Sequence, residues 1–312
     1  MITGIDNLDW MLISVSLFNA MLMGWLGLTV MLTAERRSWG VWIVEEGLLL
    51  GALFFVVHTV ILGYEQSTMD DLHNLDIWWR MGWMPVILAP LAWYVVVLWY
   101  SGFEFTRESR LFRRHIIPLS FTAIMAAGLV LMIAMFHPVP TYAQMVALDL
   151  SSARTVAGVP ILFILYPPFA LFCIAMPIDA LLHPDPAHRM MGDVARKRSR
   201  PWLIGTSAVL LAVVVLVTLF LAVIAMRAQT DFYPSRTVTQ TGFTFLALFD
   251  LLLSLLIALA VTLLGQAVVT YEVFTGKTLP RRGFLWHWRS AILLSLAVSG
   301  FIGYALVWQP LL

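Results

Sequence analysis

The stretch Ile43–Val60, IVEEGLLLGALFFVVHTV, decides the fold class, because it is long and apolar enough to cross a lipid bilayer. A membrane-spanning helix needs about 20 mostly apolar residues. The same stretch carries three ionisable side chains, Glu45, Glu46 and His58. Ionisable groups are costly in hydrocarbon and often mark a functional site. The stretch therefore predicts a membrane helix whose ionisable groups need an explanation.

The whole chain has the composition of an integral membrane protein. Of its 312 residues, 61% are hydrophobic and 12% are charged, and the mean hydropathy is +0.87. Soluble domains are about half apolar and about a quarter charged. The single cysteine excludes an intrachain disulfide and a thiolate metal cluster. The net charge of +1 gives no indication of a nucleic-acid partner, and we expect none.

Apolar segments recur along the chain and predict an all-α bundle of eight transmembrane helices in one domain, residues 1–312. The segments are 10–33, 41–62, 81–100, 116–136, 159–182, 202–226, 241–267 and 291–308. Of the 19 Lys and Arg residues, 15 lie in the first, third, fifth and seventh connections. By the positive-inside rule these connections are cytoplasmic and both termini lie outside. We expect a multi-pass protein of the bacterial cytoplasmic (inner) membrane.

Two ionisable side chains are predicted to share one depth in the outer half of the bilayer. At about 1.5 Å per residue, His58 lies roughly 9 Å and Asp250 roughly 6 Å outside the midplane. Gly47 and Gly51 fall within about 20° of the direction of His58 on the helix, which favours close helix packing there. We expect His58 and Asp250 to pair, directly or through water. The pair is either a structural hydrogen bond or a ligand-binding or proton-linked site.

The segment ILFILYPPFALF adds polar and irregular features at a similar depth. Pro167 and Pro168 remove two backbone donors in mid-span, which predicts a helix kink. Irregular helices in membranes tend to line cavities rather than lipid. The alternatives are a static kink and a pocket that opens outward, lined by His58, Tyr166, Asp250 and Asn19.

The two carboxylates of the opening stretch lie near the cytoplasmic end of their helix. Glu45 and Glu46 follow Arg36 and Arg37 closely in the sequence. Acidic groups in the first turns of a helix complement its dipole. We interpret the four residues as structural ion pairs that anchor the helix end.

One outer connection offers a possible cation site. Asp70 and His73 are three residues apart, so one helical turn could present both to a divalent cation. The same stretch also fits a capped N-terminus of a short interfacial helix, with Ser67 as the capping residue. We therefore predict no metal site, with Asp70 and His73 as the alternative, and the sequence names no cofactor.

Two stretches resemble a known class of bacterial membrane domains. They are WLGLTVMLTAERRSWGVWIVEEGLLLGALFFVVHT, residues 25–59, and GQAVVTYEVFTGKTLPRRGFLWHWRS, residues 265–290. They resemble the membrane-embedded input regions that precede cytoplasmic GAF and histidine-kinase modules in filamentous phototrophs and their relatives. The resemblance implies a sensor of a membrane-soluble or outer-face stimulus and assigns no residue roles. This chain departs from that pattern because it ends at WQPLL with no output domain, so we expect either a longer gene product or a stand-alone subunit.

Several functions remain open at this stage. We expect a non-catalytic sensor or input domain that binds a small or lipophilic ligand in the outer half of the bundle. The alternatives are a subunit of a redox or photosynthetic complex that binds quinone, haem or pigment, a small transporter, and a lipid-modifying enzyme. The expected partners are membrane lipids, and a second copy of the chain or other membrane subunits.

Overall fold

The computed structural model describes residues 4–33, 39–63, 69–103, 109–136, 139, 141–142, 155–156, 159–185, 193–229, 240–271 and 281–308. Within these ranges, eight helices are long and apolar enough to cross a membrane. They are α1 (Asp6–Thr33), α2 (Trp39–Gly63), α3 (Met69–Tyr100), α4 (Arg110–Phe136), α6 (Ile161–Leu182), α7 (Asp193–Gln229), α8 (Gln240–Tyr271) and α9 (Arg281–Trp308). A two-residue antiparallel pair, β1 (Thr155–Val156) and β2 (Val159–Pro160), precedes α6. The prediction of an all-α polytopic bundle is confirmed.

Several helices extend past the apolar segments that predict them. α3 begins at Met69 instead of residue 81, and α9 begins at Arg281 instead of residue 291. Hydropathy marks only the part of a helix that matches the hydrocarbon core, which is about 30 Å thick. The backbone hydrogen-bond pattern continues through polar turns, so the helices are longer than their apolar windows.

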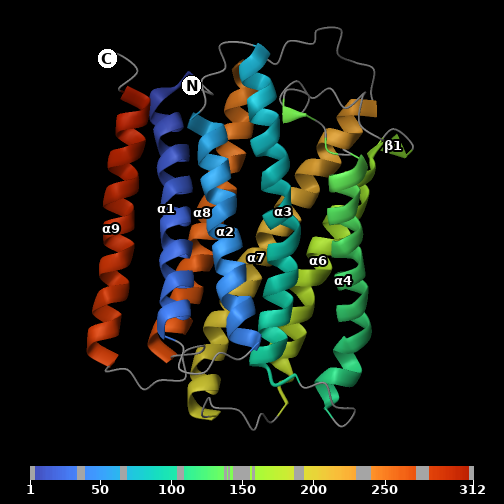
Figure 1. The fold of residues 1–312 in the computed structure, drawn as a ribbon, viewed down its shortest axis with the longest axis vertical. Helices are drawn as coiled ribbons and strands as arrows, with labels where there is room; N and C mark the ends of the chain where they lie inside the picture. The colour runs from blue at the N-terminus through green and yellow to red at the C-terminus, as the bar shows by residue number, and fades with distance from the viewer. Residues whose placement is uncertain are drawn as a thin grey trace.

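Six helices form a closed ring. α1, α2, α3, α6, α7 and α8 each contact the next in this order, and α8 contacts α1. α4 packs outside the ring against α3 and α6, and α9 packs outside it against α1 and α8 (Figure 1). Both ends of the chain lie at the same end of the bundle, as an even number of spans requires (Figure 1).

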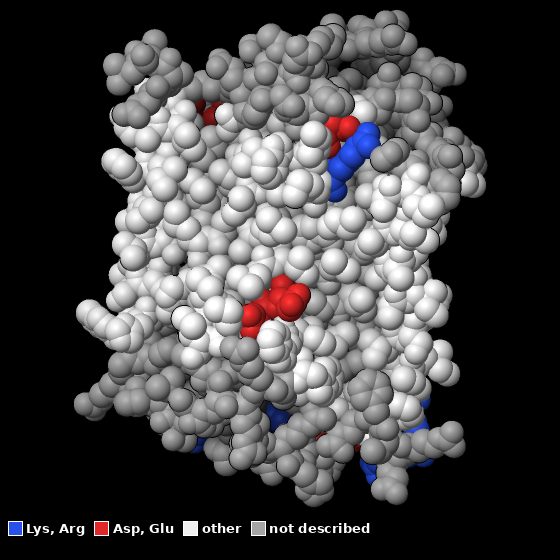
Figure 2. Space-filling model, viewed as in Figure 1, with Lys and Arg blue, Asp and Glu red and all other residues white. Residues whose placement is uncertain are grey.

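The charge distribution fits a membrane orientation. Figure 2 shows a wide band almost free of charged side chains, with basic side chains at its lower end and a basic side chain beside acidic ones near its upper right. One acidic patch interrupts this band over α2, whose acidic residues are Glu45 and Glu46. We call the end with the termini the predicted outer end, and the opposite end the predicted cytoplasmic end.

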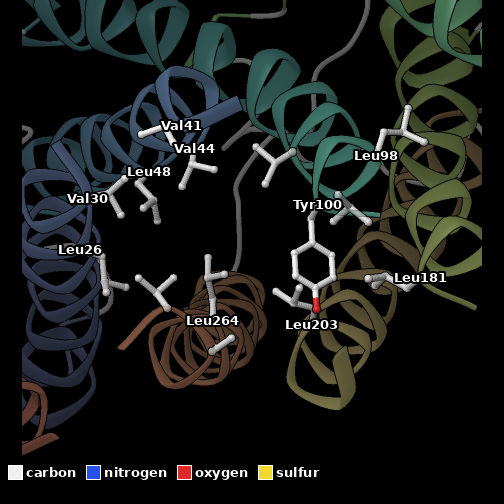
Figure 3. Packing of buried hydrophobic residues seen from close by; sticks show 14 of the residues in the cluster. Leu26, Val30, Val41, Val44, Leu48, Leu98, Tyr100, Leu181, Leu203 and Leu264 are labelled. Carbon is white, nitrogen blue, oxygen red and sulfur yellow. The ribbon is translucent and has the colours of Figure 1, made fainter. Parts of the chain in front are cut away.

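A hydrophobic cluster packs the ring helices together toward the predicted cytoplasmic end. Figure 3 shows part of this cluster, with labelled side chains from all six ring helices. Those labelled include Leu26, Val44, Leu48, Leu98, Leu181, Leu203 and Leu264. In lipid, such packing stabilises a bundle through van der Waals contact, since lipid tails are as apolar as leucine.

A buried tryptophan fixes α9 to the ring. Trp288 is 2% exposed, and a Cβ atom added at Gly265 of α8 would overlap its ring. The Trp288 ring also lies 5.7 Å from that of Trp25 on α1, between centroids. The missing side chain at Gly265 therefore creates the space in which α9 docks against α1 and α8.

We expect Gly265→Ala to lower the free energy of unfolding by about 1–3 kcal/mol, because the added methyl group must displace a rigid indole. Gly300→Ala on α9 is the matched control, since nothing lies within 4 Å of a Cβ atom there. Unfolding in mixed detergent micelles measures both variants. Equal stability of the two would contradict the docking role of Gly265.

Candidate functional site

The structure brings His58 and Asp250 together inside the ring. The Nε2 atom of His58 on α2 lies 3.1 Å from the Oδ2 atom of Asp250 on α8. α2 and α8 are both neighbours of α1 in the ring, so the pair bridges two helices that flank the same third helix. Their side chains are 18% and 33% exposed, which places neither in bulk lipid nor fully inside the protein. The shared depth expected from the sequence thus corresponds to a direct contact.

α1 supplies the second contact of the imidazole. The hydroxyl oxygen of Ser16 lies 3.2 Å from His58 Nδ1 and 2.8 Å from the hydroxyl oxygen of Thr59. Ser16 and Thr59 also reach the carbonyl oxygen of Phe55, at 3.1 Å and 2.7 Å. Phe54 stacks on the His58 ring, with centroids 5.7 Å apart and an interplanar angle of 9°. Both ring nitrogens and one ring face are therefore held by protein.

A serine, a histidine and an aspartate in contact have the composition of a nucleophilic triad. In such a triad the hydroxyl must reach the substrate. Ser16 is fully buried, lies outside the cavity lining, and shares its hydroxyl with Thr59 and the Phe55 carbonyl. We therefore interpret Ser16 as a residue that orients His58, not as a nucleophile.

The ring encloses an apolar cavity of about 590 Å³ beside the pair. On α2 its lining runs from Ile43 to Leu62, which is about 28 Å at 1.5 Å per residue. This length is close to the thickness of the hydrocarbon core. His58, Asp250 and Tyr166 all line this cavity, so the structure gathers three of the four expected pocket residues around one space.

Tyr166 faces the cavity from α6, on the other side of the ring. Its ring packs edge-on against Trp83, with centroids 5.9 Å apart. Among the described residues its hydroxyl has no hydrogen-bond partner. The helix continues without interruption through Pro167, which is buried, and Pro168, which is exposed. The prolines therefore break neither the helix nor its packing, and the kink remains a prediction.

Asn19 does not line the cavity. Its side chain is fully buried, and its Nδ2 atom donates a hydrogen bond of 2.9 Å to the backbone oxygen of Ser254 on α8. Ser254 lies one helical turn from Asp250, so Asn19 links α1 to α8 just below the pair. Its Oδ1 atom has no partner within the described part of the chain. The expectation that Asn19 lines the pocket is corrected, because its side chain points from α1 toward α8 and not into the cavity.

The two glycines of α2 serve two different helix contacts. A Cβ atom at Gly51 would lie 2.6 Å from the Met23 sulfur of α1. A Cβ atom at Gly47 would lie 3.3 Å from the Cβ of Ala92 on α3. Both glycines also line the cavity. Their small size therefore brings both neighbouring helices close to α2, two to three helical turns from His58 toward the predicted cytoplasmic end.

The carboxylates Glu45 and Glu46 lie apart from the cavity. Glu46 is exposed and Glu45 is half-buried, and neither lines the cavity. Neither makes an ion pair with a residue that the structure describes. Arg36 and Arg37 lie outside the described residues, so the ion-pair interpretation remains a prediction.

The alternative cation site, Asp70 and His73, also involves side chains outside the described ones. Asp70 and His73 fall in the first turns of α3, but their side chains are not among those described. The described residues contain no group of three His, Cys, Asp or Glu side chains able to hold a metal ion.

A second polar cluster, toward the predicted cytoplasmic end, was missed by the sequence reasoning. His115 of α4 is fully buried, with Nδ1 2.9 Å from the Tyr94 hydroxyl and Nε2 3.3 Å from Asp179 Oδ2. Asp179 of α6 also pairs with Arg114 at 2.6 Å and approaches His183 at 3.4 Å. Asp179 and His183 are four residues apart, and this spacing was the available signal. The cluster joins α3, α4 and α6, outside the cavity lining.

Comparison with known proteins gave no match to a protein-family model, to a curated protein or to a solved structure. The resemblance to bacterial input regions therefore remains a prediction.

We expect the His58–Asp250 contact to appear as a coupling energy. In a double-mutant cycle of His58→Ala and Asp250→Ala, the free energies of unfolding should differ from additivity by about 0.5–3 kcal/mol. The control cycle combines His58→Ala with Asp179→Ala, which belong to separate networks and should be additive. Additivity in both cycles would show that the contact contributes nothing to stability.

Proposed function

We propose that this protein is a non-catalytic membrane sensor or input component that binds a small or lipophilic ligand in the outer half of the bundle. We place it in the bacterial cytoplasmic membrane, as a homodimer or with other membrane subunits. The observation that carries the proposal is an apolar cavity of about 590 Å³ with the His58–Asp250 pair on its wall. Ligand sites are commonly apolar cavities of 300–1,000 Å³ with a few converging polar groups.

The serine and histidine of the site are not placed for nucleophilic chemistry. Asp250 and the Tyr166 hydroxyl line the cavity, whereas the buried Ser16 hydroxyl does not. Catalysis needs a nucleophile or a base within reach of the substrate. His58 uses both ring nitrogens for protein contacts, which favours a role in holding the carboxylate over a role as a free base.

A bound ligand could change the bundle through the same contacts. Asp250 on α8 is joined to His58 on α2, while Ser16 and Asn19 join α1 to those two helices. A ligand that contacts the carboxylate therefore acts on three ring helices at once. A ligand shifts a conformational equilibrium only through its difference in affinity for the two states. Here that difference would come from contacts to Asp250 and from the fit of the apolar lining.

Transport is the second candidate, favoured by the length of the cavity. Its lining covers about 28 Å of α2, close to the full hydrocarbon core. Quinone or pigment binding in a redox complex also fits such a space. Haem fits less well among the described residues, because axial ligation needs a free imidazole nitrogen and His58 has none.

Ligand binding in the cavity predicts site-selective photolabelling. A diazirine-bearing decanol should label residues of α2, α3 and α8 that line the cavity, as mapped by mass spectrometry of the protein in lipid nanodiscs. Ala89→Phe on α3 adds bulk to the lining and should reduce this labelling several-fold. Ala127→Phe makes the same change on the exposed face of α4 and should not. Labelling confined to lipid-facing residues, or unaffected by Ala89→Phe, would contradict the proposal.

A further inference from the structure

We propose that the cavity selects lipophilic cations, such as long-chain quaternary ammonium compounds, and that their binding releases one proton from the His58–Asp250 pair. This inference rests on the proposed ligand binding and adds the charge of the ligand. It is carried by the charge of the cavity wall, the aromatic rings that line the cavity near the level of Asp250, and the net charge of the His58–Asp250 pair.

The first observation is the charge of the side chains that line the cavity. Among the described residues that line the cavity, Asp250 is the only carboxylate, and there is no Lys or Arg. Its Oδ2 atom faces His58, while its Oδ1 atom has no partner in the described part of the chain. An anionic head group would add a negative charge beside a pair that is at best neutral, and no Lys or Arg among the described lining residues would compensate it. In a low-dielectric cavity that arrangement is strongly unfavourable.

The second observation is that three phenylalanine rings line the cavity near the level of the pair. Phe249 precedes Asp250 on α8 and stacks on Phe220 of α7, with centroids 4.4 Å apart. Phe54 stacks on the far side of the pair, against His58. All three phenylalanines line the cavity. Aromatic faces attract ammonium ions, and cages of them recognise quaternary ammonium groups.

The third observation concerns the net charge of the His58–Asp250 pair with and without a bound cation. An ionised Asp250 beside a neutral imidazole has a net charge of −1, and adding one proton to the pair makes it neutral. A net charge is costly in an apolar surrounding, so the empty site favours the neutral pair. A bound ammonium ion is balanced instead by the pair with a charge of −1. Binding of one cation therefore displaces one proton, which passes to water.

Ser16 lets the imidazole exist in both states. Its hydroxyl, 3.2 Å from Nδ1, can accept a hydrogen bond from a protonated Nδ1 or donate one to an unprotonated Nδ1. The titratable residues that line the described cavity are His58, Tyr142, Tyr166 and Asp250. The lining residues of α1, α3 and α7 include no titratable group, and the two tyrosines are far weaker acids than a carboxylic acid or an imidazolium, so the exchangeable proton belongs to the pair.

The shape of the cavity indicates a chain-like ligand. The lining on α8 extends from Leu246 to Leu264, about 27 Å, with Asp250 near the outer end. Below Asp250 the lining of α8 is almost entirely apolar, apart from Ser254. A positive head group at Asp250 and a hydrocarbon tail toward the predicted cytoplasmic end would occupy the space along its length.

The test compares probes that share one tail and differ in head-group charge. Decyltrimethylammonium, decanol and decanoate are titrated into the protein in lipid nanodiscs by calorimetry, with empty nanodiscs subtracted. Two buffers of different ionisation enthalpy give the number of protons released. We expect the ammonium probe to bind at least about tenfold more tightly than decanol, with decanoate weakest. One proton should be released for each ammonium bound and none for decanol.

Two matched variants locate the effect. Asp250→Asn should bring the ammonium-to-decanol affinity ratio close to one and abolish proton release. Glu46→Gln makes the same chemical change on the exposed surface of α2 and should leave the ratio unchanged. The wild-type charge series and proton count test the inference even if Asp250→Asn does not fold.

The outcomes separate this inference from the function on which it rests. If decanoate binds as tightly as the ammonium probe, or if the ammonium probe releases no proton, the cation inference is overturned while cavity binding stands. If none of the three probes binds, or if Ala89→Phe affects none of them, both the inference and the proposed function fall. Preference for the ammonium with proton release, lost in Asp250→Asn alone, supports both.

Discussion

A polar group inside a bilayer must find its partners within the protein, and the His58–Asp250 contact is where this constraint acts most strongly here. Lipid cannot solvate the two side chains at that depth, so each depends on the other, on neighbouring helices and on the cavity that both line. His58 is held by Asp250, Ser16 and the Phe54 ring. The positions of α1, α2 and α8 in this layer follow from satisfying these few atoms.

The remainder of the bundle is held by contacts of three other kinds. Small residues allow close approach, as at Gly265, where the missing side chain admits the Trp288 ring. Toward the predicted cytoplasmic end, the Tyr94, His115 and Asp179 cluster joins α3, α4 and α6. Aliphatic side chains also pack between the ring helices at this end (Figure 3). The cavity lies where none of these contacts fills the space between the ring helices.

The cavity lining carries the His58–Asp250 pair at one level and is mostly apolar at the others. The helices that line it must present apolar groups to avoid unpaired polar atoms. The exception is the layer of His58 and Asp250, where a paired carboxylate still has one oxygen facing open space. A partly satisfied polar group in such a place is expensive to keep. Its presence is the feature of this protein that most needs a functional explanation.

The sequence by itself determined the class of fold and the depth of the polar residues. Long apolar segments can be stable in only one way in a bilayer, as helices, so the eight spans were predictable. A helix has a fixed rise per residue, so the shared depth of His58 and Asp250 could also be calculated.

Only the tertiary structure decided which residues meet. A single helix does not reveal its neighbours, and the ring order α1, α2, α3, α6, α7, α8 was not apparent from the chain. That order turns Asn19 toward α8 instead of the cavity, and brings Tyr94, His115 and Asp179 together from three helices. The depth of a residue in the bilayer is a local property of one helix, whereas the direction of its side chain depends on how all the helices pack. For this reason the sequence predicted the level of the site but not all of the residues that form it.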